Sequence, residues 1–231
     1  MFKENTKGSG SENALIAPSF KLLSPDELEL VNSHRYEVSY KRGETIFKQG
    51  SACTHIISFS SGLAKIYLEG YNKKNLIVRL VKPGEFIASP GLNATDKHYY
   101  SISAIEKSNV SFIETSIFKS IFKRNHGFAD SLMREIHRNY SKTLQKLINL
   151  NQKHRMGRIA EALIYLSEDI YESDSFELTL TKKELADMTG MSTESSFRIL
   201  RELDDEGKIL LDKKNIKIVD KNFLIQMSEI G

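Results

Sequence analysis

Hydrophobic residues recur with two different periods along the chain, and the period changes near residue 126. Before that point they form short runs rich in β-branched and aromatic residues, separated by glycine or polar turns, which is typical of strands. The predicted strands cover residues 35–40, 44–47, 55–59, 63–68, 75–81, 86–88, 99–104 and 108–113. Short strands at this spacing favour an antiparallel sandwich or barrel over a parallel sheet.

The segment ahead of these strands has no such pattern. Residues 1–20 are expected to form a flexible arm, and the first dozen are polar and lack the apolar core of a signal peptide. Ser24 and Pro25 then predict a helix start, with the helix running to about residue 32. Because no apolar run approaches the ~18 residues of a membrane span, we expect a cytoplasmic protein with no membrane partner.

From residue 126 the apolar positions predict one long helix. They recur at alternating spacings of three and four, which is the seam of a coiled coil. The seam consists of Met133, Ile136, Tyr140, Thr143, Leu147 and Leu150, and a neighbouring stripe consists of Leu132, Leu144 and Ile148. One stripe can pack on the strands and the other on a second copy of the chain; the alternative is a helix packed only within its own chain. The pattern breaks at residues 151–153, which predicts a hinge before another helix at 156–170.

Residues 178–207 read as two short helices around a tight turn. Thr181 and Glu184 form a capping box for a helix at 182–188, Gly190 supplies the turn, and Ser192 can cap the second helix. The second helix has two stripes: Ile199, Leu200 and Leu203 on one, and Thr193, Glu194, Phe197, Arg198 and Arg201 on the other. After Gly207, residues 208–219 predict two strands about a polar turn. This order predicts a winged helix-turn-helix whose second stripe faces DNA.

The outward stripe has the chemistry needed to read bases. Arg198 suits a bidentate contact with guanine, and Glu194 can accept from a cytosine amino group. The alternative is an ordinary i,i+4 surface ion pair between the two. Lysines at the helix start and in the wing are expected to contact phosphate, although a charged surface face is the competing interpretation: they are Lys182, Lys183, Lys213 and Lys214.

The charge distribution argues partly against DNA. The net charge is only +3, and acids outnumber bases sixteen to nine from residue 159 to 231, whereas residues 123–158 hold nine bases and two acids. Neutralisation of phosphates normally dominates affinity for DNA. Several acids precede the helix-turn-helix and can lie on its far side: Glu161, Glu168, Asp169, Glu172, Asp174 and Glu177.

The helix-turn-helix segment, with Glu206-Gly-Lys-Ile after it, resembles the DNA-binding end of the CRP/FNR transcription regulators. Residues 42–50, 61–67 and 81–87 are similar to the turn-and-strand motifs of their cyclic-nucleotide-binding β-roll, and the motifs follow the family's order. The resemblance implies that Glu194 and Arg198 read the half-site. Thr193 replaces an Arg usual in the cyclic-AMP-dependent members, and Phe197 replaces a residue that is usually small.

The resemblance implies an α+β multidomain protein. Its parts are expected to be a flexible arm at 1–20, a jelly-roll-like antiparallel β-roll that acts as sensor at 21–125, a dimerisation helix at 126–152 and a winged helix-turn-helix at 153–231. It implies a homodimeric, sequence-specific regulator of transcription that binds double-stranded DNA with a two-fold operator, with RNA polymerase as a candidate partner.

The ligand positions of the β-roll depart from the cyclic-AMP-binding pattern. Members that bind cyclic AMP carry an Arg for the phosphate and a Glu for the ribose, whereas this chain has Ala88-Ser89 and His98-Tyr99 at the matching places. A buried phosphate is hard to hold without such an arginine, so we predict a pocket not built for cyclic AMP. The candidate effector pocket is Gly84, Glu85, Ser89, His98 and Tyr99. A protonated His98 could receive an anion; the alternative is an ordinary strand or surface histidine.

No cofactor is evident, and an unknown small-molecule effector remains a candidate. The single cysteine, Cys53, cannot hold an iron–sulfur cluster, and the six histidines, His34, His55, His98, His126, His137 and His154, have no spacing typical of haem ligation. A cyclic-nucleotide- or haem-dependent sensor stays an alternative. A cupin-like metalloenzyme using His55, His98 and Glu85 is another, but the chain has no His-x-His and no common catalytic motif. We therefore expect neither a metal site nor an enzyme.

Overall fold

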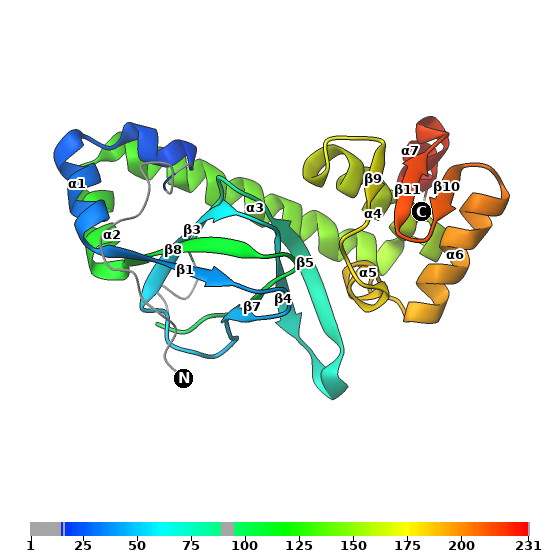
Figure 1. Ribbon diagram of the computed structural model, residues 1–231, viewed down its shortest axis with the longest axis horizontal. Helices are drawn as coiled ribbons and strands as arrows, with labels where there is room; N and C mark the ends of the chain where they lie inside the picture. The colour runs from blue at the N-terminus through cyan, green and yellow to red at the C-terminus, as the bar shows by residue number, and fades with distance from the viewer. Residues whose placement is uncertain (1–14, 16, 89–94, 231) are drawn as a thin grey trace. The chain divides into compact units, whose positions relative to one another are not determined.

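The computed structural model describes Leu15, residues 17–88 and residues 95–230 (Figure 1). Contacts divide the chain into two compact units. The first comprises residues 1–69 and 80–140, and the second comprises residues 70–79 and 141–231. No helix in the described ranges is long and apolar enough to cross a membrane.

Two four-stranded sheets contain the strands of the N-terminal half among the described residues (Figure 1). Their orders are β1(Arg35–Tyr40), β8(Ser108–Glu114), β3(His55–Ser61), β6(Phe86–Ile87) and β2(Thr45–Phe47), β7(Ser101–Ala104), β4(Ala64–Glu69), β5(Asn75–Val81). Pairing is antiparallel for β1 with β8, β3 with β8 and β6, and β7 with β2 and β4. Every predicted strand is confirmed, and its ends shift by two residues or fewer. The antiparallel fold class predicted from the short runs is therefore confirmed.

Helices of the first unit pack phenylalanine rings against the sheets. The helical elements are η2(Pro18–Leu22), α1(Pro25–Ser33), α2(Thr115–Arg124) and the beginning of α3(His126–Gln152). Phe86 of β6 lies with its ring centroid 5.5 Å from Phe20, 5.6 Å from Phe118 and 6.5 Å from Phe128. Aromatic side chains bury large apolar areas, so this cluster stabilises the attachment of η2, α2 and α3 to the sheet that contains β6. The helix α2 has no counterpart in the sequence prediction.

The expected flexible arm at 1–20 needs correction at its end. Residues 1–14 and 16 lie outside the described residues, but Ala17, Ser19 and Phe20 are buried. Phe20 belongs to the core cluster that also contains Phe118 and Phe128. The end of the predicted arm is therefore part of the core, because burying a phenylalanine ring outweighs the polar character of the residues before it.

The second unit is mainly helical. It contains α4(Arg155–Tyr165), a wider turn η5(Leu166–Ile170), β9(Ser175–Glu177), α5(Lys182–Thr189), α6(Thr193–Asp205), β10(Ile209–Asp212), β11(Asn215–Ile218) and α7(Lys221–Ile230). The three strands pair antiparallel in the order β10-β11-β9. The helix-turn-helix and the two strands of its wing are confirmed as predicted, whereas β9 and α7 were not predicted. The short turn Tyr71–Lys73 (η3) joins β4 to β5.

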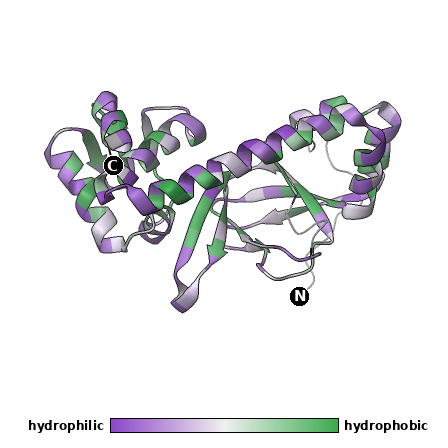
Figure 2. Ribbon diagram, turned by 180° about the vertical axis from the view of Figure 1, so that it is seen from behind, coloured by the Kyte–Doolittle hydropathy of each residue, from purple (hydrophilic) through white to green (hydrophobic). Residues whose placement is uncertain are grey.

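Hydropathy follows these elements closely (Figure 2). The strands of the N-terminal half are largely hydrophobic, while α3 alternates hydrophobic and hydrophilic residues along its length. In the second unit the amphipathic helices bury one face each: Leu185, Ala186 and Met188 on α5, and Ile199, Leu200 and Leu203 on α6. An amphipathic helix that buries one stripe leaves the opposite stripe available for another function.

Candidate nucleic-acid interface

Local hydrogen bonds fix the first residue of each helix in the helix-turn-helix. The Thr181 hydroxyl accepts the Glu184 N–H at 3.1 Å, and the Glu184 carboxylate accepts the Thr181 N–H at 2.8 Å. The Ser192 hydroxyl accepts the Ser195 N–H at 3.1 Å at the start of α6. Both predicted caps are confirmed. They satisfy N–H groups that would otherwise lack partners at the two helix starts.

Gly190 makes the turn between the two helices. Its φ is +63°, the left-handed region, and a Cβ built there would lie 2.9 Å from Cδ2 of Leu150 on α3. The positive φ favours glycine at this position, whereas the Leu150 methyl would only have to shift to admit a Cβ. Leu150 was predicted to lie in the dimer seam; in the structure it is partly exposed and lies beside this turn, and its place in the seam stays a prediction.

The outward stripe of α6 is open to solvent. Thr193, Glu194, Arg198 and Arg201 are exposed, and Phe197 is partly exposed. Ser196 on the same helix is buried, and its hydroxyl donates to the Ser192 carbonyl at 3.1 Å. The structure therefore brings all five residues predicted for the reading face to one exposed face of α6.

Arg198 has a different partner from the one that its spacing to Glu194 suggests. Its guanidinium Nη1 lies 2.6 Å from the Glu202 carboxylate, one turn further along α6. Both side chains are largely exposed, 58% for Arg198 and 41% for Glu202, so this pair is worth only about 0.3–0.5 kcal/mol. Glu202 was not singled out from the sequence, although its i,i+4 spacing to Arg198 equals that of Glu194.

The two lysines that open α5 differ in their contacts. Lys183 lies 2.9 Å from both carboxylate oxygens of Asp187 and so forms an ion pair. The ammonium of Lys182 lies 4.3 Å from the ring centroid of Phe197. An exposed cation–π contact of this kind is worth about 0.5–1 kcal/mol. Both lysines were predicted to contact phosphate. Among the described contacts, Lys183 has a carboxylate partner and Lys182 has an aromatic ring.

The wing is a tight hairpin that is fixed to the segment before α5. Asp212 pairs with Asn215, Lys213 has a positive φ of 54°, and the carbonyl of Lys214 accepts the Leu178 N–H at 2.8 Å. The side chains of Lys213 and Lys214 are exposed at the tip. The predicted placement of both lysines at the wing tip is confirmed, while their contact with phosphate stays a prediction.

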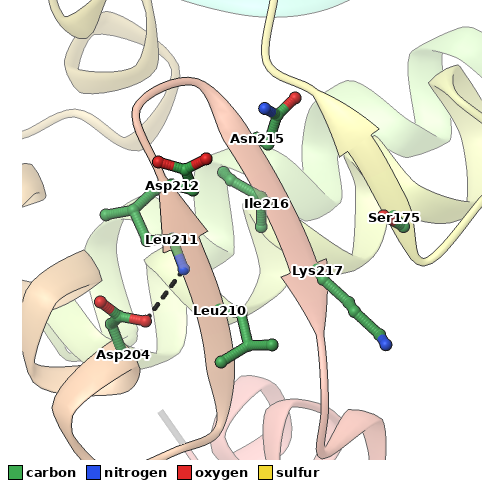
Figure 3. Close-up of a pocket in the computed structure, with 8 residues that line it drawn as sticks. All are labelled: Ser175, Asp204, Leu210, Leu211, Asp212, Asn215, Ile216 and Lys217. Atoms are coloured by element: carbon green, nitrogen blue, oxygen red, sulfur yellow. Dashed lines mark hydrogen bonds between the residues drawn. The ribbon is translucent and has the colours of Figure 1, made fainter.

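Beside the wing lies a shallow hollow of about 330 Å³ (Figure 3). It is lined by Ser175, Asp204, Leu210, Leu211, Asp212, Asn215, Ile216 and Lys217. The Asp204 carboxylate accepts the Leu211 N–H at 2.9 Å and so links the end of α6 to β10 (Figure 3). This bond occupies a backbone donor on the outer strand of the three-stranded sheet.

Most acids ahead of the helix-turn-helix are engaged by cations. Lys221 lies 3.1 Å from Glu168 and 3.0 Å from Asp174, and Lys142 lies 3.3 Å from Asp169. Lys221 is already one of the nine bases counted from residue 159 to 231, but Lys142 lies outside that range. Its ion pair with Asp169 adds one positive charge that the count omits, which slightly weakens the argument against DNA.

The end of α3 is bound to α4 by a polar network. Glu161 of α4 accepts from Asn149 at 2.6 Å and from Lys153 at 3.3 Å, and Arg158 donates to the carbonyls of Thr189 at 3.2 Å and Gly190 at 3.4 Å. Burial lowers the pKa of the nearby Lys146 ammonium; Glu161 opposes this shift, and Lys153 and Arg158 add to it. The network connects α3 to the helix-turn-helix and was not predicted, because its members are far apart in sequence.

The candidate effector residues lie in differing surroundings. Gly84 and Glu85 form a turn whose backbone bonds to Phe59 of β3 at 2.9 Å, and the Glu85 carboxylate accepts the Lys82 N–H at 2.9 Å. His98 is buried, whereas Tyr99 is exposed. Ser89 lies outside the described residues. The Glu85 carboxylate is thus a cap for its own turn, and the pocket itself stays a prediction.

His98 belongs to an aromatic cluster of the roll. Its ring stacks on Phe47 of β2 at 4.0 Å, and Phe47 contacts Phe112 of β8 at 5.8 Å. Tyr36 stacks on Phe112 at 5.2 Å, and His55 approaches the same ring at 6.0 Å. His98 is therefore not an ordinary surface histidine, because its side chain is buried against the ring of Phe47.

Burial changes the protonation of these rings. It lowers the pKa of His98, and it lowers the pKa of His55 against the opposing charge of Glu114. It also raises the pKa of Tyr40 to about 12. Desolvation disfavours the charged form of each group, so both imidazoles favour the neutral form. Among the described residues no cluster of three or more histidine, cysteine or carboxylate side chains could hold a metal ion.

The predicted dimer surface of α3 is exposed and wider than expected. Met133, Ile136, Tyr140 and Leu147 of the seam are exposed, Thr143 is partly exposed, and Leu144 and Ile148 of the neighbouring stripe are exposed as well. Only Leu132 of that stripe is buried, in the first unit's core. A continuous row of exposed apolar side chains is typical of an interface.

Comparison with known proteins agrees with this geometry. Family models match the cyclic nucleotide-binding domain at residues 37–125 and the Crp-like helix-turn-helix domain at residues 157–227. The cAMP-activated global transcriptional regulator CRP of Salmonella typhimurium is 24% identical over 195 residues, which cover 83% of this chain and 93% of that protein. The transcriptional activator protein Anr of Pseudomonas protegens is 23% identical over 184 residues, covering 78% of this chain and 75% of that protein. The solved structure of FixK2 from Bradyrhizobium japonicum has a TM-score of 0.76 at 18% identity, covering 84% of this chain and 96% of that chain, and so has the same fold.

Proposed function

The chain belongs to the CRP/FNR family of DNA-binding transcription regulators, and we propose that it binds a two-fold operator as a homodimer that reads each half-site with α6. The observation that carries the proposal is the exposed face of α6. It presents Glu194, Arg198 and Arg201 to solvent, while the opposite face is buried in the domain. A recognition helix needs this division of its two faces.

Each residue of the interface has a proposed role. Arg198 contacts the O6 and N7 atoms of a guanine, and Glu194 accepts from a cytosine amino group. Lysines and an arginine around them contact phosphates: Lys182, Lys183, Arg201, Lys213 and Lys214. Because Lys183 is paired with Asp187, we expect it to contribute the least of these.

The homodimer rests on α3. A second copy that covers Met133, Ile136, Tyr140 and Leu147 would remove an exposed apolar row from water. The two recognition helices would then be related by a two-fold axis. Leu147→Glu puts a charge into this interface and should give monomers. Arg138→Glu, at an exposed position on the opposite side of α3, is the control and should leave the dimer intact. Sedimentation equilibrium measures the outcome, and a Leu147→Glu dimer would place the interface elsewhere.

The sensor half is proposed to respond to something other than cyclic AMP. Positions that match the family's phosphate arginine and ribose carboxylate hold other residues, and His98 is buried on Phe47. An unidentified small molecule and RNA polymerase are the remaining proposed partners, and the cytoplasm is the proposed location. The domain limits at residues 20, 125 and 152 stay predictions.

Selection from random duplexes tests the function directly. The full-length protein should enrich an inverted repeat, and a labelled copy of that repeat should be bound by a dimer in mobility-shift titrations. Calorimetry with cyclic AMP should give no heat of binding at physiological concentration. Recovery of no preferred sequence would contradict the DNA-reading role, and micromolar affinity for cyclic AMP would contradict the altered sensor.

A further inference from the structure

One side chain on the reading face does not fit the chemistry of its neighbours. Phe197 is apolar, yet it lies on the stripe that carries Glu194, Arg198 and Arg201, and its ring is partly exposed. Glu194 precedes it by three residues and Arg201 follows it by four, so all three project from one face of α6. A partly exposed phenylalanine in the middle of a polar reading face leaves apolar surface in contact with water, which is unfavourable in the free protein.

The ring is held in place by a contact from the other helix. The ammonium of Lys182, the first residue of α5, lies 4.3 Å from the ring centroid of Phe197. The contact uses one face of the ring, because the negative potential of an aromatic ring is at its faces. The positive charge is also at an unfavourable place for the isolated helix, since it lies at the N-terminus of α5 where the helix dipole prefers an anion. The cation–π contact contributes only about 0.5–1 kcal/mol against these costs, so the stability of the domain gives little reason for either residue.

Adjacent Lys183 shows that this arrangement is specific to Lys182. Lys183 is the next residue at the same helix end, but its ammonium is bound by both oxygens of Asp187 at 2.9 Å. In the described contacts Lys182 contacts an aromatic ring and Lys183 contacts a carboxylate. The two lysines thus form a natural pair of test and control positions.

We propose that Phe197 contacts the 5-methyl group of a thymine in each half-site, and that Lys182 is a positioning residue that holds the ring for this contact. The inference rests on the proposed function. In the major groove the thymine methyl is the apolar group that distinguishes one base pair from the others, and phenylalanine is among the side chains that contact it. The thymine lies within or next to the base pairs that Glu194 and Arg198 contact, because Phe197 lies between these residues on the helix.

The test removes only the methyl group. Each thymine of the selected inverted repeat is replaced in turn, in both half-sites, by deoxyuridine, which keeps all hydrogen-bonding groups. Wild-type protein should lose about fourfold in affinity for each methyl removed at one thymine position, a factor that corresponds to transfer of a single CH₂-sized group from water. Other thymines should have no effect.

Protein variants connect this loss to the two residues. Phe197→Ala should bind the thymine and deoxyuridine duplexes equally, while keeping the preference of Arg198 for guanine and the affinity for random DNA. Lys182→Gln should reduce the thymine-to-deoxyuridine ratio, Lys182→Arg should restore it, and Lys183→Gln should leave it unchanged. Lys183→Gln removes the same charge from the same helix end without a contact to the ring, so its unchanged ratio separates a positioning role from a simple loss of charge.

The outcomes separate this inference from the proposed function. If no duplex is selected at all, the proposed function is wrong and the inference with it. If an operator is selected but its affinity is indifferent to every thymine methyl, or if Phe197→Ala keeps the wild-type ratio, the inference alone is overturned.

Discussion

The aromatic cluster of the β-roll and the reading face of α6 both combine rings with titratable side chains, but they do so with opposite results. In the roll, His98 stacks on Phe47 at 4.0 Å and His55 lies near Phe112, so these rings contact each other. On α6, the ring of Phe197 contacts only a lysine among its described ring and cation contacts, and the neighbouring charges are exposed. The first region uses its chemistry to stabilise the fold, and the second leaves it available to a ligand.

The largest expected difference comes from the same substitution made in both regions. Phe112→Ala removes a ring that contacts Tyr36, Tyr40 and Phe47, and should lower the free energy of unfolding by about 3–5 kcal/mol. Phe197→Ala loses one exposed cation–π contact and should cost about 1 kcal/mol or less. Urea unfolding monitored by circular dichroism measures both values. Equal losses would mean that Phe197 is a core residue and not part of a binding face.

Within the interface, two cations should differ in kind. Arg198→Ala should cost about 1–3 kcal/mol of affinity on the selected site and little on random duplex, because it removes the proposed base contact. Lys214→Ala should weaken both alike and lower the salt slope by about one, because we propose that its wing-tip position contacts only phosphate. Titrations at several salt concentrations, with random duplex as competitor, separate the two. An equal effect of Arg198→Ala on both duplexes would make Arg198 a phosphate contact.

The roll should lose stability in acid through its buried histidines. Burial lowers the pKa of His98 in the folded protein, whereas the unfolded chain titrates near the usual value of about 6.5. The folded state therefore binds fewer protons. Its stability from His98 is present above the unfolded value and is lost as the pH falls through the folded one.

Thermal unfolding between neutral pH and mild acid tests this sign. His98→Gln should show a smaller loss of melting temperature on acidification than the wild-type protein, with His55 responsible for part of what remains. His137→Gln, at an exposed position of α3, controls for the loss of an imidazole. An unchanged acid response in His98→Gln would show that His98 does not contribute to it.

The smallest expected effect concerns the partner of Arg198. Glu202→Gln removes the carboxylate 2.6 Å from the guanidinium and should cost only about 0.3–0.5 kcal/mol of stability, since both groups are exposed. It should also raise affinity for random DNA slightly, because a negative charge is lost near the phosphates. Glu206→Gln, an exposed acid beyond the end of α6, is the matched control for charge. If both variants gain equally, the effect is one of net charge and not of freeing Arg198.

Structural features that depend on residues close together in the sequence were predictable. The helix caps at Thr181 and Ser192, the turn at Gly190, the strands and the long helix follow from signals within a few residues of each other. The candidate reading face followed for the same reason, because helical spacing decides which side chains share a stripe. The prediction that needed correction depends on burial, because Phe20 at the end of the expected arm is in the core. The positions of Leu150 beside the turn and of His98 on a ring are tertiary contacts that the sequence pattern did not predict.

By itself the sequence determined the strands of the N-terminal half, the long helix, the helix-turn-helix with its wing, and the family to which the chain belongs, but not α2, β9 or α7. Only the tertiary structure decided which partners the side chains take. Arg198 has a glutamate four residues away on either side, and spacing alone cannot choose between Glu194 and Glu202. Contacts such as Lys182 with Phe197 join residues of different helices. They depend on how the elements pack, because a side chain binds the group that packing places within its reach, and many groups along the chain have suitable chemistry.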